Sequence, residues 1–276
     1  MALSPQAAAF WQAMADAPQQ VSLPIAQRRE AGEHAEDATS EPNGVTTTAW
    51  RDGLLVTPSE GTPAATILYI FGGGYMLGSP QSRRKTAGHL ASAANAAVYV
   101  PNYRLAPEHP FPAAFDDIVT AFEALPTDLP IFVAGDSSGG GLAIAIATAV
   151  GARGVIAFSP WADLTCSGGT MTTNVHRDIE CTPASLRQMA DWYAARHDRA
   201  DPKLSPALHP AGIPPLIAFA GTEEVLLDDA RRVTAGADAT LVIGDGMQHV
   251  WPIWVGAFPE ADAAVQRAGR WLRDHI

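Results

Sequence analysis

Short apolar runs alternate with helix-like stretches through most of the chain, and this alternation restricts the fold more than any other feature. The runs lack the polar–apolar alternation of half-buried strands, so we expect strands that are buried on both faces. Parallel strands need crossover connections, which the intervening helices can provide. The sequence therefore predicts an α/β fold with a mostly parallel central sheet flanked by helices. The expected strands are residues 67–71, 97–100, 131–134, 155–158, 216–219 and 240–243.

The amino-terminal part of the chain has a different pattern. Residues 45–50 and 54–56 are strand-like and turn at Arg51-Asp52-Gly53, so a hairpin should add antiparallel strands at one edge of the sheet. A short helix is expected at 7–15, whereas residues 28–41 are charged and without periodicity and are expected to form an exposed loop. The helices that connect the buried strands are expected at 85–94, 115–124, 140–150 and 228–234.

One interval breaks the alternation of strands and helices. Residues 162–206 contain no strand candidate, only a loop and one helix at 183–195. An insertion between strands usually lies over the carboxyl ends of a sheet, where ligands bind. Together with about residues 1–44 it could form a small helical cap. The 276 residues show no repeat and no linker, so we expect residues 1–276 to form a single domain.

Composition excludes several classes of protein. The chain has 18 Lys and Arg against 29 Asp and Glu, a net charge of −11 that repels nucleic-acid phosphates and anionic lipid. The longest nearly apolar run, residues 139–152, is too short to span a bilayer, and the amino-terminal residues lack a signal-peptide pattern. Cys166 and Cys181 offer neither a disulfide framework nor zinc spacing. We expect a cytoplasmic protein with no nucleic-acid partner and no stable membrane insertion.

The segment 131–141 carries the most specific motif. An expected strand is followed by Gly-x-Ser-x-Gly and then by a helix of small residues, the arrangement of a nucleophile elbow. The turn is so tight that its flanking positions cannot carry bulky side chains, and Gly135 and Gly139 meet this need while Ser137 projects into the crevice. A chance Gly/Ser-rich turn is the alternative, but the strand and helix context favours a nucleophile.

A serine hydroxyl becomes a good nucleophile only when a base accepts its proton, so a histidine is required. Among the eight histidines, His249 differs because it follows the last expected strand, in a loop before the carboxy-terminal helix. Loops at strand ends are where such sites place their base. The other histidines lie in charged, polar, Pro-flanked or terminal segments, or on a helix in the case of His89, where a structural role is favoured.

The acid of such a site should lie between the serine and the histidine in sequence, at another strand end. The segment 220–229 holds four carboxylates, Glu223, Glu224, Asp228 and Asp229, so an acid can reach His249. Position alone leaves the choice open, and the cluster is also compatible with the start of a helix, where negative charge is favoured. Asp228 and Asp229 are expected on the first turn of that helix, facing solvent or its amides.

Three consecutive glycines, 72–74, follow the first buried strand. The transition state of acyl transfer carries an oxyanion, which needs backbone N–H donors already directed at it. Consecutive glycines let the backbone approach a ligand closely and turn its N–H groups inward. A dinucleotide-binding loop is the alternative, but Gly78-Ser79-Pro80 interrupts the chain where a helix should begin.

In combination, these motifs resemble those of the bacterial hormone-sensitive-lipase-like esterases. The resemblance runs from about residue 67 to the carboxyl terminus. It is carried by the triple glycine, Tyr-Arg-Leu-Ala-Pro-Glu at 103–108, Gly-Asp-Ser-Ser-Gly at 135–139, Ser-Pro-Trp-Ala-Asp-Leu at 159–164, the acidic loop and Gly-Met-Gln-His at 246–249. It implies an α/β-hydrolase core with a helical cap, no cofactor and no metal.

The resemblance also assigns residues to the site. It implies Ser137, Glu224 and His249 as the catalytic triad, with Glu224 at the position of the family's usual aspartate. Phe71 stands where the family usually has a histidine, so we expect packing, not a side-chain hydrogen bond, to hold the glycine loop. The implied oxyanion hole consists of the amides of Gly73, Gly74 and Ser138, and the expected substrate pocket of Tyr75, Met76 and Trp161.

The expected function is that of a serine carboxylesterase, which hydrolyses small short-acyl esters through an acyl-enzyme intermediate. An amide, lactone or acetyl-group hydrolase with the same triad remains an alternative, because the sequence does not separate these substrates. A non-catalytic small-molecule receptor on this fold is another, although such receptors lose the base and this chain retains His249. The expected partner is a small-molecule ester, with a homodimer as an open alternative to the monomer.

Overall fold

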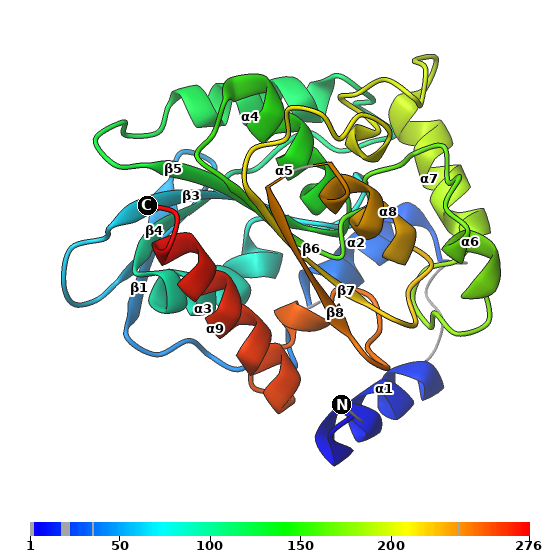
Figure 1. Ribbon diagram of the computed structural model, residues 1–276, viewed down its shortest axis with the longest axis horizontal. Helices are drawn as coiled ribbons and strands as arrows, with labels where there is room; N and C mark the ends of the chain where they lie inside the picture. Colours follow the sequence, from blue (N-terminus) through cyan, green and yellow to red (C-terminus); the bar gives the residue numbers. More distant parts are fainter. Residues whose placement is uncertain (1–2, 18–22, 35, 237) are drawn as a thin grey trace.

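An eight-stranded sheet forms the centre of the computed structural model, which describes residues 3–17, 23–34, 36–236 and 238–276 (Figure 1). The strand order is β1-β2-β4-β3-β5-β6-β7-β8. The strands are β1 (Val45–Trp50), β2 (Gly53–Pro58), β3 (Ala65–Ile70), β4 (Ala96–Val100), β5 (Ile131–Asp136), β6 (Val155–Phe158), β7 (Leu216–Gly221) and β8 (Ala239–Gly244).

The direction of the strands agrees with the sequence prediction. β1 and β2 form the expected hairpin, and β2 lies antiparallel to β4. All pairs from β4 to β8 are parallel. Every residue of β3, β4, β6 and β7 is buried, as runs without polar alternation predict. The α/β fold with a mostly parallel sheet is thus confirmed.

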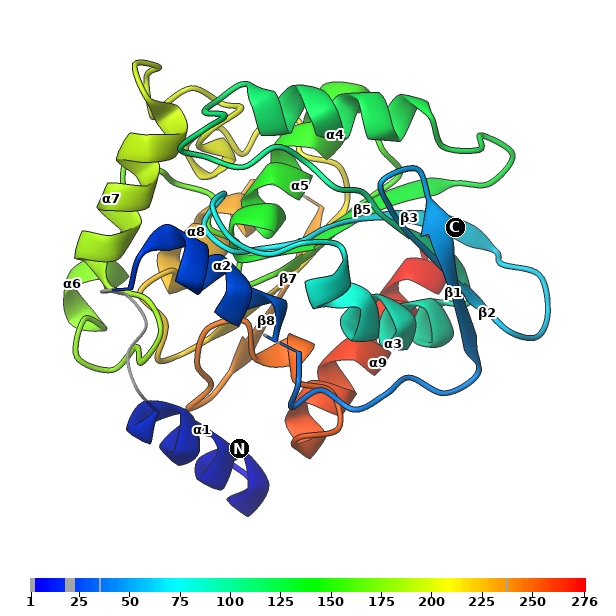
Figure 2. The same ribbon diagram turned by 180° about the vertical axis from the view of Figure 1, so that it is seen from behind.

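Helices cover both faces of the sheet. α3 and α9 pack against each other on one face, while α4, α5 and α8 lie on the other (Figures 1 and 2). This arrangement follows from the parallel strands, whose crossovers place helices over both faces. The helices of these two layers are α3 (Arg84–Ala94), α4 (Ala113–Glu123), α5 (Ser137–Val150), α8 (Leu227–Thr234) and α9 (Pro259–Arg273).

The remaining helices gather near one end of the sheet. α2, α6 and α7 lie together there, and α1 lies below them in Figure 2. Residues 1–2, 18–22 and 35 of the expected cap are outside the described residues. No helix of the described ranges is long and apolar enough to cross a bilayer. These elements are α1 (Pro5–Asp16), α2 (Ile25–Glu33), α6 (Thr170–Thr173) and α7 (Pro183–Ala194), and the short 3₁₀ helices are η1 (Gln81–Arg83), η2 (Pro206–Leu208) and η3 (Trp251–Ile253).

The prediction of an exposed loop at 28–41 was wrong for its first part, which belongs to α2. This helix has no apolar stripe, so the sequence offered no periodicity to detect. Its position is fixed by Arg29, whose guanidinium donates to the carbonyls of Met76, at 2.9 Å, and Ala106, at 3.1 Å. Arg29 also forms a bidentate ion pair with Glu108. Contacts with distant parts of the chain therefore hold this helix.

Candidate active site

Ser137 lies at the junction of β5 and α5, in a tight turn. Its φ of 53° is in the left-handed region, which costs energy for a residue with a side chain. A Cβ atom at Gly135 would collide with the carbonyl oxygen of Gly139, and one at Gly139 with the carbonyl oxygen of Ile70. The predicted requirement for glycine at both positions is confirmed.

The structure brings Ser137, His249 and Glu224 into one chain of hydrogen bonds. Ser137 Oγ lies 2.9 Å from His249 Nε2, and His249 Nδ1 lies 3.0 Å from Glu224 Oε2. The three residues follow β5, β8 and β7, whose carboxyl ends meet at one edge of the sheet. The side chains of His249 and Glu224 are almost entirely buried, whereas Ser137 is partly exposed. This geometry allows proton transfer from the hydroxyl to the imidazole.

The other three carboxylates of this loop lie elsewhere. Glu223 pairs with Arg177 at the surface. Asp228 accepts a hydrogen bond from the Thr170 amide at 3.0 Å and pairs with Arg231. The prediction that Asp229 faces solvent or the amides of its own helix was wrong. It is fully buried and accepts hydrogen bonds from the amides of residues 162 and 163, both at 2.8 Å, because the chain after β6 passes over α8.

A residue that sequence reasoning missed holds the acid in place. Ser159, directly after β6, donates from Oγ to Glu224 Oε1 at 2.7 Å and accepts from the Val250 amide at 3.0 Å. The Gly221 amide donates to the same carboxylate oxygen. Oε2 of Glu224 is thereby left for His249. Ser159 begins the Ser-Pro-Trp motif, but nothing in the motif indicates which side chain it contacts.

The pKa values of His249 and Glu224 are shifted by burial and by the hydrogen bond that joins these two residues. Burial raises the pKa of Glu224, and the hydrogen bond from His249 only partly offsets this. Burial alone lowers the pKa of His249, but Cys181 and Glu224 together raise it well above the usual value. Burial also raises the pKa of Cys181 to about 11, so near neutral pH the charge that favours an imidazolium is the carboxylate.

The glycine loop after β3 lies beside Ser137. Gly73 has a φ of 127° and Gly74 of 64°, both unfavourable for residues with side chains. Within the described residues, the amides of Gly73 and Gly74 donate no backbone hydrogen bond. The amide of Ser138 is in the first turn of α5, where no helical acceptor is available. These amides therefore lack a backbone acceptor in the described part of the chain, as the expected oxyanion hole requires.

A buried ion pair ties the glycine loop to the nucleophile turn, and the sequence prediction missed it. The carboxylate of Asp136 is fully buried and accepts from Arg83, with the closest nitrogen at 2.8 Å. It also accepts from the Gly72 amide at 3.1 Å and from the Tyr69 hydroxyl at 3.0 Å. Because Asp136 directly precedes Ser137, this carboxylate fixes the distance between the serine and the loop.

Phe71 packs at the base of the glycine loop, as expected. Its ring stacks on Tyr103 with centroids 4.2 Å apart. The Tyr103 hydroxyl donates to the carbonyl oxygen of Phe71 at 2.8 Å, a hydrogen bond that does not depend on the side chain at position 71. Packing and a distant tyrosine thus hold this part of the backbone.

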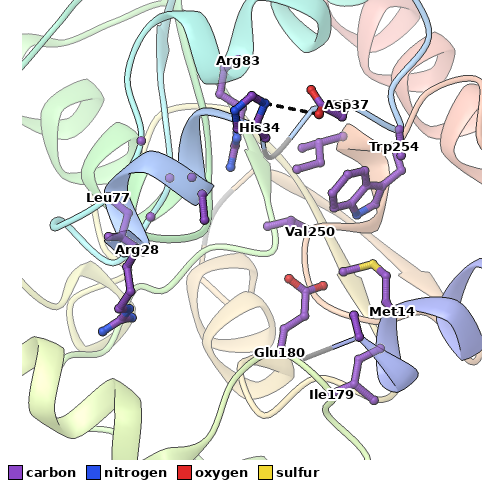
Figure 3. A pocket seen from close by; sticks show the side chains of 18 of the residues that line it. Met14, Arg28, His34, Asp37, Leu77, Arg83, Ile179, Glu180, Val250 and Trp254 are labelled. Atoms are coloured by element: carbon purple, nitrogen blue, oxygen red, sulfur yellow. Dashed lines mark ion pairs between the residues drawn. The ribbon is translucent and has the colours of Figure 1, made fainter. Parts of the chain in front are cut away.

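A cavity of about 620 Å³ is lined by Gly72 and Gly73 of the glycine loop and by Val250, the residue after His249 (Figure 3). Tyr75, Met76 and Trp161, predicted to line the substrate pocket, do not line it and are at most 2% exposed. Tyr75 turns away because its φ is positive, and its ring stacks on Tyr193 with centroids 3.6 Å apart. The lining comes instead from several other segments. It includes Phe10 and Met14 from α1, Arg28, His34 and Asp37 from α2 and the residues after it, Gly72, Gly73 and Leu77 from the glycine loop, Arg83 from η1, Ile179 and Glu180 from the segment after α6, and Val250 and Trp254 from the segment after β8.

Comparison with known proteins defines the class of the chain. Residues 67–253 match the family model of the α/β hydrolase fold, and the chain belongs to that family. It is 40% identical over 266 residues to an acetyl-hydrolase of Streptomyces hygroscopicus, with 89% of each chain covered. An esterase from the bacterial hormone-sensitive lipase family has a similar structure, with a TM-score of 0.89, 30% identity and full coverage of both chains. An esterase/lipase from an uncultured bacterium gives a TM-score of 0.90 at 30% identity and 99% coverage of each chain. The resemblance expected from the sequence is confirmed.

Proposed function

We propose that this chain is a serine carboxylesterase that hydrolyses small esters with short acyl groups. The observation that carries the proposal is the hydrogen-bonded series Ser137–His249–Glu224. The similarity to an acetyl-hydrolase and to two esterases supports both the reaction and the short acyl group. The retained histidine argues against a receptor without catalysis.

In the proposed mechanism, Ser137 attacks the ester carbonyl while His249 accepts its proton. The amides of Gly73, Gly74 and Ser138 stabilise the oxyanion of the tetrahedral intermediate. His249 then gives the proton to the leaving alcohol, and the acyl-enzyme remains. A water molecule, deprotonated by His249, attacks the acyl group and releases the acid. Glu224 keeps the imidazole in the required tautomer and stabilises its charged form.

We further propose that the two segments expected to form a cap, residues 1–44 and 162–206, shape the space for the substrate. Residues from both segments line the cavity, among them Met14 and Glu180. The residues that transfer the acyl group would then follow strands of the sheet, and the cap would determine which substrates fit. Removal of an acetyl group is a second candidate description of the reaction, favoured by the similarity to the acetyl-hydrolase.

The decisive experiment replaces the nucleophile. Ser137→Ala should abolish hydrolysis of p-nitrophenyl acetate, since losing the nucleophile of a triad costs about a million-fold in turnover. Circular dichroism and the melting temperature should stay near those of the parent, because Ser137 is partly exposed and the substitution is small. Turnover of the variant within about tenfold of the parent would exclude the assignment. A parallel panel of anilides and lactones shows which leaving groups the site accepts.

A further inference from the structure

A carboxyl group without a partner points into the cavity beside the active site. Glu180 lines the cavity, and Figure 3 shows its side chain directed towards Val250 and the open space. Its Oε1 atom is closed off from solvent and has no hydrogen-bond partner among the described residues. Neither the sequence motifs nor the proposed mechanism uses this residue.

Hydrogen bonds hold the backbone around Glu180. Asp178 accepts hydrogen bonds from the amide of Glu180 at 2.9 Å and, with its other oxygen, from the amide of Val225 at 2.9 Å. The Ile179 amide donates to Gln248 Oε1 at 3.2 Å, next to His249 in the chain. The loop that carries Glu180 is therefore attached to the loops that carry both the acid and the base.

Burying a carboxyl group without a partner is unfavourable. Burial raises the pKa of Glu180 to about 7, the neighbouring His249 lowers it, and the carboxylates of Asp178 and Glu224 raise it. A cationic group next to Glu180 would favour its ionised form.

The cations that line the cavity do not fill this role. Arg83 is bound to Asp136, and His34 lies 3.3 Å from Asp37. Arg28 lies across the cavity from Glu180 in Figure 3. The partner of Glu180 is thus absent from the described part of the chain, and a ligand can supply it.

The position of Glu180 indicates which part of a substrate it would meet. His249 has to protonate the leaving oxygen, so the alcohol portion of an ester must extend past the imidazole. Val250, the next residue in the chain, and Glu180, a neighbour of His249, both line the cavity. We propose that Glu180 binds a protonated amine in the alcohol portion, so that esters of short amino alcohols are the preferred substrates.

This inference rests on the proposed function and names the substrate class of the same site. The reaction remains ester hydrolysis, in which the acyl–oxygen bond breaks, water supplies the hydroxyl of the acid and its remaining proton goes to the alcohol. The products are a short carboxylic acid and an amino alcohol. Glu180 is a specificity-determining residue in this scheme and takes no part in proton transfer to the reacting atoms.

The test uses two acetate esters of nearly identical shape near neutral pH. One is 2-(dimethylamino)ethyl acetate, which is protonated, and the other is 3-methylbutyl acetate, which has a carbon in place of the nitrogen. The parent should have a kcat/KM at least about tenfold higher for the amine, the scale of a hydrogen bond to a charged group. Glu180→Gln and Glu180→Leu should reduce this ratio to near one. Asp37→Asn, which removes a paired carboxylate from the same cavity, should keep the preference.

A second measurement separates this inference from the proposed function. Calorimetry should show that 2-(dimethylamino)ethanol binds the parent more tightly than 3-methylbutanol does, and that Glu180→Gln removes the difference. Equal binding of the two alcohols by the parent, or an ester ratio unchanged by Glu180→Leu, would overturn the role of Glu180. If the alcohols are distinguished but no ester is hydrolysed, the binding site stands and the esterase assignment fails.

Discussion

The hydrogen bonds around Glu224 show how a glutamate fits where the family usually has the shorter aspartate. Its two carboxylate oxygens have separate partners, Ser159 and the Gly221 amide on Oε1 and His249 on Oε2. Both contacts on Oε1 come from the ends of neighbouring strands, β6 and β7, so the carboxylate is held against the sheet. The additional methylene, compared with aspartate, is accommodated in the turn after β7 without displacing the oxygen that meets the imidazole.

The first residue-scale prediction concerns this acid. Glu224→Gln keeps the shape but removes the charge that stabilises the imidazolium, so kcat should fall by at least about a hundredfold. Asp228→Asn is the matched control. Asp228 contacts Thr170 and Arg231 and not His249, so its turnover should stay near that of the parent. Steady-state kinetics of the two variants decide between the carboxylates, and a reversed result would make Asp228 the acid.

The second residue-scale prediction concerns pH. Only neutral His249 can accept the serine proton, and the hydrogen-bonded carboxylate of Glu224 raises the pKa of His249 against the effect of burial. The acid limb of kcat/KM should therefore have its midpoint above the usual histidine value of about 6.5, with activity rising as the pH increases. The residual activity of Glu224→Gln should show a lower midpoint. A parental midpoint at or below about 6.5 would contradict this account.

At the scale of elements, the glycine loop is fastened to the rest of the site at three points. Asp136 binds the Gly72 amide, the Tyr103 hydroxyl binds the Phe71 carbonyl, and Ser138 Oγ accepts from the Tyr75 amide at 3.2 Å. Two of these partners flank Ser137 in sequence. The serine and the amides that face it therefore keep their relative position, which is the requirement for stabilising an oxyanion without reorganisation.

A pair of substitutions tests which contact holds the loop. Phe71→His should change kcat less than about tenfold, because Tyr103 still donates to the backbone carbonyl at position 71. Tyr103→Phe should be the more harmful change, since it leaves a buried carbonyl unsatisfied at a cost of about 1–3 kcal/mol in unfolding free energy. Chemical denaturation and nitrophenyl acetate kinetics measure both effects. If Phe71→His lowers kcat more than a hundredfold, on the scale of a lost oxyanion donor, the ring itself positions the loop.

The sheet could be predicted from the sequence, whereas much of what surrounds the site could not. Apolar runs located the strands, because strands buried on both faces need continuous apolar sequence. α2 was missed because Arg29 is held by distant carbonyls, which leave no periodic pattern. Ser159 and Arg83 were missed for a similar reason, since their partners are far away in sequence. The direction of Tyr75 depends on its positive φ, which the residue type does not indicate.

At the scale of the whole molecule, the first helix contacts the start of the last helix beside the cavity. Ser4, which caps α1, binds Glu260 in α9 through its amide at 2.7 Å and its hydroxyl at 2.8 Å. Phe10 of α1 packs on Trp254 and Phe258, with ring centroids 5.2 and 5.3 Å apart. A wall of the cavity thus depends on contact between the first helix and the last part of the chain.

This arrangement predicts that α1 contributes to substrate binding more than to chemistry. Phe10→Ala removes aromatic contacts from the cavity wall and should raise KM several-fold with kcat little changed. Gln12→Ala, on the same helix but bonded only to the exposed Asp16, is the control and should leave both constants unaltered. A fall in kcat without a change in KM for Phe10→Ala would place α1 in the catalytic step instead.

The carboxylate of Asp178 also couples the segment after α6 to the loop of Glu224. One of its oxygens accepts from the amide of Glu180 in its own segment, and the other accepts from the amide of Val225, next to Glu224. An outward movement of the segment after α6 would therefore break or strain a hydrogen bond to the loop that carries Glu224.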